Sequence, residues 1–152
     1  MNVILDSGYL IELFRKNNPY HQIANQVWEI AKDDRYKLHT LWECLAEASH
    51  KLSTEGRRAM LAWLARERVN VHSSHIADLL PMADYMAKYA SASKGDGADV
   101  TDVALVFLAE KLKTLHIFTV DENDFSAYRT RAGQPFQILW LTEVHRRLAQ
   151  NT

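Results

Sequence analysis

The sequence has little of several features that would define its class at once. A single cysteine, Cys44, cannot close a disulfide within the chain, and one thiol suits a reducing cytoplasm. We expect Cys44 to be a small buried apolar residue. The first six residues lack a basic start followed by a long apolar run, so no secretion signal is predicted. These absences favour a cytoplasmic protein.

Long apolar runs and an excess of charge of one sign are also missing. No stretch reaches the ~20 apolar residues that a membrane-spanning helix needs, so no membrane protein is expected. Lys and Arg number 18 against 19 Asp and Glu, which leaves a net charge of −1. The chain has no global basic field for nucleic acid, so any contact with phosphates must come from a local patch.

What remains is the composition of one folded domain. Of the 152 residues, 47% are hydrophobic and 24% are charged, which is ordinary for a globular protein. A chain of this length buries roughly 70% of its unfolded surface, enough for a core without disulfides. No repeat, low-complexity tract or linker divides it. We therefore expect a single domain over residues 1–152.

Short β-rich segments alternate with helical patterns along the chain. Strands are predicted at 3–5, 36–41, 69–72, 116–120 and 136–140. Helices are predicted at about 10–14, 19–32, 42–52, 55–66 and 100–113, and a further one reaches Tyr89 with Pro81 in its first turn. Asp99 is predicted to cap one helix and Asp124 to cap a short turn of helix. Residues 91–97 should form a loop, and 142–148 a helical tail.

Strands that alternate with helices predict an α/β layer fold with a mainly parallel sheet and helices on both faces. In such folds ligands bind at the carboxyl ends of the strands, near the point where the strand order reverses. The segments to inspect are therefore those that follow Leu5, Leu41 and Val120.

Acidic residues stand at or near each of these points. They are Asp6, the pair Glu43 and Glu47, the pair Asp99 and Asp102 at the start of a helix, and the pair Asp121 and Asp124. Each one alone has an ordinary explanation as a helix cap, a turn residue or a solvated charge. Their joint placement at the edge that the fold predicts independently favours a shared site.

Clustered carboxylates need a positive partner. Two unit charges ~4 Å apart repel by roughly 4 kcal/mol at an effective dielectric constant of ~20. A hard divalent cation such as Mg²⁺ or Mn²⁺ prefers oxygen ligands and would offset this repulsion. No histidine or cysteine converges on these acids in the sequence pattern, which argues against zinc.

Four motifs occur in a characteristic order. They are residues 4–8, with Asp6 and Ser7; residues 45–48 after Thr40, with Glu47; residues 99–106, with Asp99 and Asp102; and residues 119–125, with Asp121 and Asp124, followed by Tyr128 and Arg129. Together they resemble the PIN domains, and especially the VapC-like toxins of prokaryotic toxin–antitoxin pairs. The resemblance covers nearly the whole chain; one departure is Val103, where the family often has alanine.

This resemblance implies a specific fold and site. The family's parallel sheet has the order 3-2-1-4-5, which places the first and fourth strands side by side. Asp6, Glu47, Asp102 and Asp121 would then form an acidic site that holds Mg²⁺ or Mn²⁺, with Asp99 and Asp124 as supporting ligands. The implied reaction is hydrolysis of RNA phosphodiester bonds. Ser7 or Thr119 could orient a ligand, although local backbone capping explains them equally well.

The resemblance also implies partners: an RNA substrate, a small antitoxin protein and a second copy of the chain. The densest local basic content is Arg57, Arg58, Arg66 and Arg68, which are candidates for contacts with RNA phosphates. Each of these arginines is individually more often a solvated surface charge.

Other functions fit the sequence less well. An aspartyl-phosphate phosphatase needs a second acid two residues after the first, where this chain has Gly8. A phosphoacceptor receiver domain carries its acceptor after the third strand, where this chain has Val71-His72-Ser73. An inactive PIN-like binding module and a housekeeping PIN nuclease both stay open as alternatives to a toxin.

Overall fold

The computed structural model describes residues 1–89 and 98–139. Within these ranges a parallel sheet of five strands has the order β3-β2-β1-β4-β5. Its strands are β1 (Asn2–Leu5), β2 (Lys37–Leu41), β3 (Asn70–His72), β4 (His116–Phe118) and β5 (Gln137–Ile138). The predicted strand order is therefore confirmed, while β4 and β5 are shorter than predicted.

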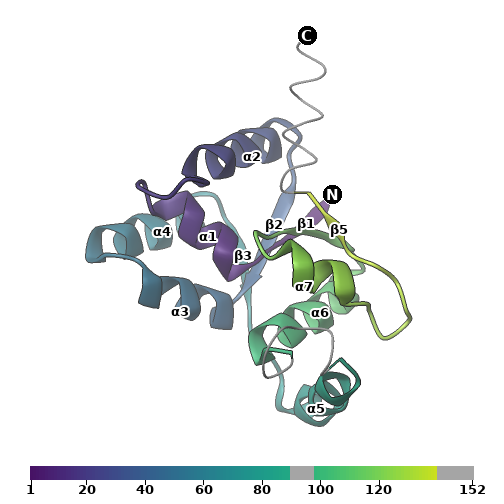
Figure 1. The fold of residues 1–152 in the computed structure, drawn as a ribbon. Coiled ribbons are helices and arrows are strands. Elements are labelled where there is room, and N and C mark those ends of the chain that lie inside the picture. The colour runs from purple at the N-terminus through teal and green to yellow at the C-terminus, as the bar shows by residue number, and fades with distance from the viewer. Residues whose placement is uncertain (90–97, 140–152) are drawn as a thin grey trace.

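Helices cover both faces of the sheet (Figure 1). They are α1 (Ser7–Phe14), α2 (His21–Asp33), α3 (Trp42–Lys51), α4 (Thr54–Arg66), a 3₁₀ turn η1 (Ile76–Asp78), α5 (Leu79–Lys88), α6 (Val100–Leu112) and α7 (Glu122–Ala127). Pro81 lies in the first turn of α5, as predicted. The loop predicted at 91–97 and the tail predicted at 142–148 lie outside the described residues, as does Trp140 of the last predicted strand.

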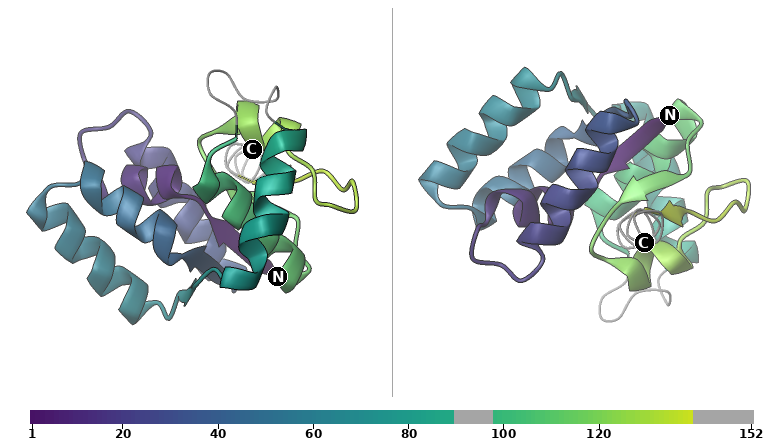
Figure 2. Two further views of the ribbon diagram at one scale, coloured as in Figure 1. Left: turned by 90° about the horizontal axis from the view of Figure 1, so that it is seen from below. Right: turned by 90° about the horizontal axis from the view of Figure 1, so that it is seen from above.

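The three layers follow from the alternation of side chains along the strands. On β1, Val3 and Leu5 point into a core shared with α1, α2, α3 and α4. Ile4, between them, points into a second core with α5, α6 and α7. The two halves of the helical cover are seen on either side of the sheet in Figure 2. Because both faces of β1 are buried, its three core residues are apolar without interruption.

Helix caps fix where several elements begin. Ser53 caps α4 by accepting a hydrogen bond from the backbone N–H of Gly56, and Asp99 caps α6 by accepting one from Thr101. The prediction for α7 was wrong in one respect: Asp121, not Asp124, is its N-cap and accepts from the backbone N–H of Asp124. The helix begins at Glu122, about one turn earlier than predicted. Asp124 therefore lies inside the first turn.

Polar side chains also link three neighbouring strands. His39 on β2 is buried; its Nε2 lies 3.0 Å from Asn2 Oδ1 on β1, and its Nδ1 lies 3.0 Å from His72 Nε2 on β3. An amide oxygen can only accept, so His39 Nε2–H donates to Asn2 and His39 Nδ1 accepts from His72. We call these three residues the histidine ladder. Burial lowers the pKa of His39 to about 4, and His72 and Lys37 contribute to the shift.

Candidate active site

The first strand delivers Asp6 to the centre of the sheet edge. Strands β1 and β4 are neighbours, with Leu5 paired to Phe118, and the backbone N–H of Asp6 donates to the carbonyl of Phe118. Asp6 is also the N-cap of α1, so its helix-capping role and its place in the site coexist. Its side chain is only 5% exposed.

Two hydroxyl residues hold the Asp6 carboxylate in place. Oδ1 accepts from the backbone N–H of Ser7 at 2.7 Å and from the Ser7 hydroxyl at 3.3 Å. Oδ2 accepts from the Thr119 hydroxyl at 2.7 Å, and Thr119 Oγ1 itself accepts from the backbone N–H of Asp121 at 2.9 Å. Thr119, fully buried, therefore connects the acid that follows β1 to the acid that follows β4.

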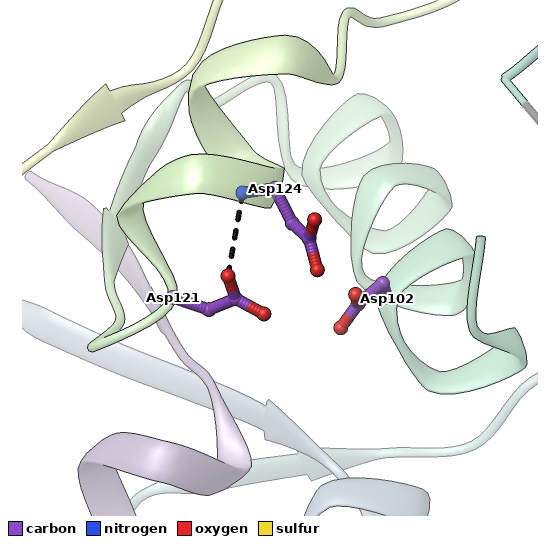
Figure 3. Close-up of side chains that lie close together, drawn as sticks. All are labelled: Asp102, Asp121 and Asp124. Atoms are coloured by element: carbon purple, nitrogen blue, oxygen red, sulfur yellow. Dashed lines mark hydrogen bonds between the residues drawn. The ribbon is translucent and has the colours of Figure 1, made fainter. Parts of the chain in front are cut away.

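A triad of carboxylates lies beside this pair of strands. Asp102 comes from the first turn of α6, Asp121 caps α7 and Asp124 lies in its first turn. One oxygen of each lies within 4.8 Å of the others, and the three side chains point toward a common centre in Figure 3. This spacing allows all three acids to bind a single ion. We call Asp6, Asp102, Asp121 and Asp124 the carboxylate cluster.

The raised pKa values of three acids in the cluster reflect the crowding of the carboxylates. Burial, then the charges of Glu47 and Asp121, raise the pKa of Asp6 to about 6, against the hydrogen bonds from Thr119 and Ser7 that lower it. Burial and the charges of Asp6, Asp99 and Asp121 raise the pKa of Asp102 to about 8. Burial raises the pKa of Asp124 to about 6, and its contact with Asp121 adds to the effect. Each shift means that the folded chain resists carrying these charges without a partner.

No Lys or Arg among the described residues forms an ion pair with the cluster. The ion pairs in the described part of the chain are Lys32–Glu29, Arg66–Glu67, Lys111–Asp78 and Arg131–Glu110, and none includes a member of the cluster. An acid-rich edge that forms no ion pair within residues 1–89 and 98–139 has the oxygen donors that a hard divalent cation prefers. The residues present therefore fit a hard divalent cation, and its identity as Mg²⁺ or Mn²⁺ stays a prediction.

The remaining predicted residues differ in their relation to the cluster. Glu47, half-buried on α3, is close enough for its charge to raise the pKa of Asp6. Asp99 is exposed and caps α6, and its charge raises the pKa values of Asp102 and Asp124. Neither belongs to the triad whose oxygens converge.

The predicted basic patch is not brought to the carboxylates. Arg57, Arg58 and Arg66 are exposed on α4, and Arg68 is exposed directly after it. Figures 1 and 2 place α4 on the other side of α1 and α3 from α6 and α7. Contact between these arginines and RNA stays a prediction, and it would require a substrate that reaches around this side of the molecule.

Gly8 lies in one of the motifs named above and Tyr128 follows another, but no role in the site was predicted for either residue. The Tyr128 hydroxyl donates to Asp102 Oδ2 at 3.3 Å, although the two residues are 26 positions apart. Gly8 lies where an added Cβ would come within 2.6 Å of Val120 Cγ2, so the first turn of α1 and the segment after β4 approach closely only because residue 8 has no side chain. Both effects depend on packing between distant segments, which local patterns do not encode.

Comparison with known proteins places the fold. No family model and no curated protein sequence matches the chain. Among solved structures, VapC20 of Mycobacterium tuberculosis, described as a sarcin–ricin loop cleaving toxin, superposes with a TM-score of 0.64. The match has 14% sequence identity and covers 79% of this chain and 90% of that protein.

This likeness defines the class of architecture. The chain has a three-layer α/β fold of the PIN type, with the sheet order 3-2-1-4-5 that the motifs predicted. The particular protein it is similar to is a toxin, and at this identity the likeness concerns the fold. No helix among the described residues is long and apolar enough to cross a membrane.

Proposed function

We propose that this protein is a divalent-metal-dependent endoribonuclease and the toxin of a toxin–antitoxin pair. One observation carries the proposal: acids from β1, α6 and α7 converge at the carboxyl edge of a PIN-type sheet without a cationic partner in the described chain. The fold that the chain shares with a protein described as a sarcin–ricin loop cleaving toxin also supports this proposal.

Each residue of the proposed site has a distinct task. Asp102, Asp121 and Asp124 would hold a Mg²⁺ or Mn²⁺ ion, which when bound supplies Lewis-acid stabilisation of charge on the scissile phosphate. Ser7 and Thr119 fix the orientation of Asp6, so that this carboxylate faces the site without rearranging. Glu47 adds negative charge near Asp6 and Asp99 adds it near Asp102, which favours binding of a cation.

The biological partners are part of the proposal. Ile76, Leu79 and Leu80 of η1 and α5 are 87%, 54% and 79% exposed, an apolar face that a second copy of the chain would cover in a homodimer. L80K should then convert the dimer to a monomer in light scattering, while L61K, at a half-exposed leucine of α4, should not.

Inhibition by a small antitoxin predicts that expression of the chain alone arrests bacterial growth and that its antitoxin relieves the arrest.

A cleavage assay on total RNA tests the enzymatic part. The purified chain should cleave RNA with Mg²⁺ or Mn²⁺, lose activity in EDTA and regain it when the metal is restored. D6N should be inactive, whereas D33N, a matched change at an exposed acid that ends α2, should be fully active. Full activity in chelator would refute the metal mechanism.

The second candidate is a PIN-type module that binds RNA or protein without cleaving it. The presence of acids at each edge position argues against it, because a binding module has no need of crowded, uncompensated carboxylates. A wild-type chain that folds, binds Mn²⁺ and leaves RNA intact under every condition would favour this alternative. A harmless wild-type chain that nonetheless cleaves RNA in vitro would instead favour a housekeeping nuclease.

A further inference from the structure

The Tyr128 side chain joins the two helices that carry the carboxylate triad. It follows α7, the helix that bears Asp124 and is capped by Asp121. Its hydroxyl, however, donates to Asp102 Oδ2 on α6, at 3.3 Å. Tyr128 thus fixes a ligand from one helix relative to the two ligands of the other.

The position of this hydroxyl is set by the packing of the ring. The Tyr128 side chain is 1% exposed, and its ring meets Phe125 edge-on at a centroid distance of 5.3 Å. Tyr89 and Tyr85 enclose it at 6.2 and 6.5 Å. The Tyr85 hydroxyl donates to the carbonyl of Arg129 at 2.6 Å, which holds the backbone next to Tyr128. Since aromatic packing locates the ring, phenylalanine would fill the same space without the hydroxyl.

The hydrogen bond matters because Asp102 has few alternatives. Among the described residues, Tyr128 is the one side chain that donates to the Asp102 carboxylate. Burial and three neighbouring acids oppose a charged, ordered carboxylate at this point. A neutral donor of fixed position holds one oxygen and orients the other without adding a positive charge that would repel a cation.

We propose that Tyr128 is a positioning residue that aims the Asp102 carboxylate at the cation shared with Asp121 and Asp124. The proposal rests on the proposed metal-dependent function and adds a residue that acts through Asp102 without binding the metal itself. Loss of a partner that orients a metal ligand typically weakens metal affinity by about 10–100-fold. Y128F should therefore bind Mn²⁺ about 10-fold more weakly than the wild type.

A calorimetric titration of the full chain with Mn²⁺ at constant pH tests this proposal directly. Wild type, Y128F and Y9F are compared, since Tyr9 is also fully buried and donates its hydroxyl to a backbone carbonyl, that of Ala24, away from the acids. Weaker binding in Y128F together with wild-type binding in Y9F supports the proposal. Equal Mn²⁺ affinity in Y128F and wild type overturns it.

Further measurements separate positioning from stability and from the proposed function. Melts in EDTA identify a temperature at which both variants are folded, and the titrations are made there. In the D102N background, Y128F should change Mn²⁺ affinity no further, because the acid that it orients is gone.

RNA cleavage by Y128F should be restored by raising Mn²⁺, whereas a general packing defect would not respond to metal. A wild type that binds no Mn²⁺ refutes the proposed function along with this inference, whereas unequal results among the variants bear on Tyr128 alone.

Discussion

The carboxylate cluster and the histidine ladder are two groups of polar residues at the same sheet, and they satisfy their side chains in opposite ways. The ladder is complete: His39 uses both ring nitrogens, one on Asn2 and one on His72. The cluster is open, because Asp102, Asp121 and Asp124 lie close together and take part in none of the ion pairs in the described part of the chain. Polar groups that close on themselves stabilise a fold, while crowded charges left open favour a ligand.

The two groups also respond to pH in opposite directions. For Asp102 the folded pKa, about 8, lies above the unfolded value of 3.8, so its stabilising contribution is full below pH 3.8 and is lost as pH rises through 8. For His39 the folded pKa, about 4, lies below the unfolded value of 6.5, so stability is lost as pH falls from 6.5 toward 4. Between pH 4 and 6.5 these two contributions oppose each other, and above pH 6.5 only the loss from Asp102 remains, so the metal-free protein should become less stable from pH 6.5 to 8.

The largest expected effect is that of D102N on the open cluster. Cleavage should fall by more than about 100-fold. Loss of a residue that only orients a metal ligand costs up to about 100-fold, and Asp102 is proposed to be a ligand itself. The metal-free variant should nonetheless be more stable than wild type by about 1–3 kcal/mol at pH 8, because a crowded charge is removed at constant size.

Paired thermal melts with EDTA and with Mg²⁺ measure this second effect. The stabilisation by Mg²⁺, which arises from binding only the folded state, should shrink in D102N. A less stable metal-free D102N with an unchanged Mg²⁺ response would mean that Asp102 serves only the first turn of α6, and the contrast with the ladder would disappear.

Gly8 tests whether the cluster depends on the close approach of two segments. Gly to Ala inside a helix normally stabilises by about 0.5–1 kcal/mol. At position 8 the new Cβ would meet Val120 Cγ2 at 2.6 Å, so G8A should instead destabilise by about 1–3 kcal/mol and displace the segment that carries Thr119 and Asp121. Cleavage should fall by about 10-fold, since small displacements of catalytic groups are costly.

The second-site variant G8A/V120A is the control, because it removes the atoms that the new methyl group would meet. Mn²⁺ affinity and cleavage should return toward the wild-type values, and the coupling between the two changes is read from the double-mutant cycle. If G8A alone matches the wild type in both measurements, the approach of α1 to this segment is looser than the structure places it.

The dependence of stability on pH in the metal-free protein should distinguish the carboxylate cluster from the histidine ladder, because D102N changes only the contribution of the cluster. Between pH 6.5 and 8 the wild type should lose stability, because Asp102 is ionised in the unfolded chain while the folded chain still holds its proton, and D102N should flatten this slope. Adding Mg²⁺ should also flatten it, because the cation favours the charged carboxylates. Urea unfolding in EDTA at intervals of pH measures the slope; equal slopes in wild type and D102N would contradict the raised pKa.

The smallest effect is expected from H39Q in the closed ladder. Glutamine retains a donor and an acceptor but cannot reproduce the spacing of the imidazole nitrogens, so about 1 kcal/mol of stability should be lost at pH 8. The deficit should narrow as pH falls toward 4, because the wild type loses its contribution there and the variant has none to lose. Mn²⁺ affinity should be unchanged, and a clear loss of affinity would show that the two regions are coupled.

Much of this architecture was predictable because the patterns that encode it are local. Alternation and apolar runs located each strand, whereas the order 3-2-1-4-5 was implied by the family resemblance of the motifs that carry Asp6, Glu47, Asp102 and Asp121. The predictions that proved wrong concern the segment after β4, where a turn replaces the expected end of the strand. β4 ends at Phe118, the hydroxyl of Thr119 then donates to Asp6, and Asp121 rather than Asp124 caps α7.

The sequence by itself determined which residue types stand at the ends of the strands. It therefore also determined that carboxylate oxygens, which can bind a cation, would gather at the carboxyl edge of the sheet. Only the tertiary structure decided which acids converge: Asp102, Asp121 and Asp124 form the triad, while Glu47 and Asp99 act from its margins. It also decided that Tyr128 contacts Asp102 and that His39 joins Asn2 to His72. The physical reason is that charge and periodicity are written along the chain, whereas a hydrogen bond between distant residues depends on how whole helices and strands pack.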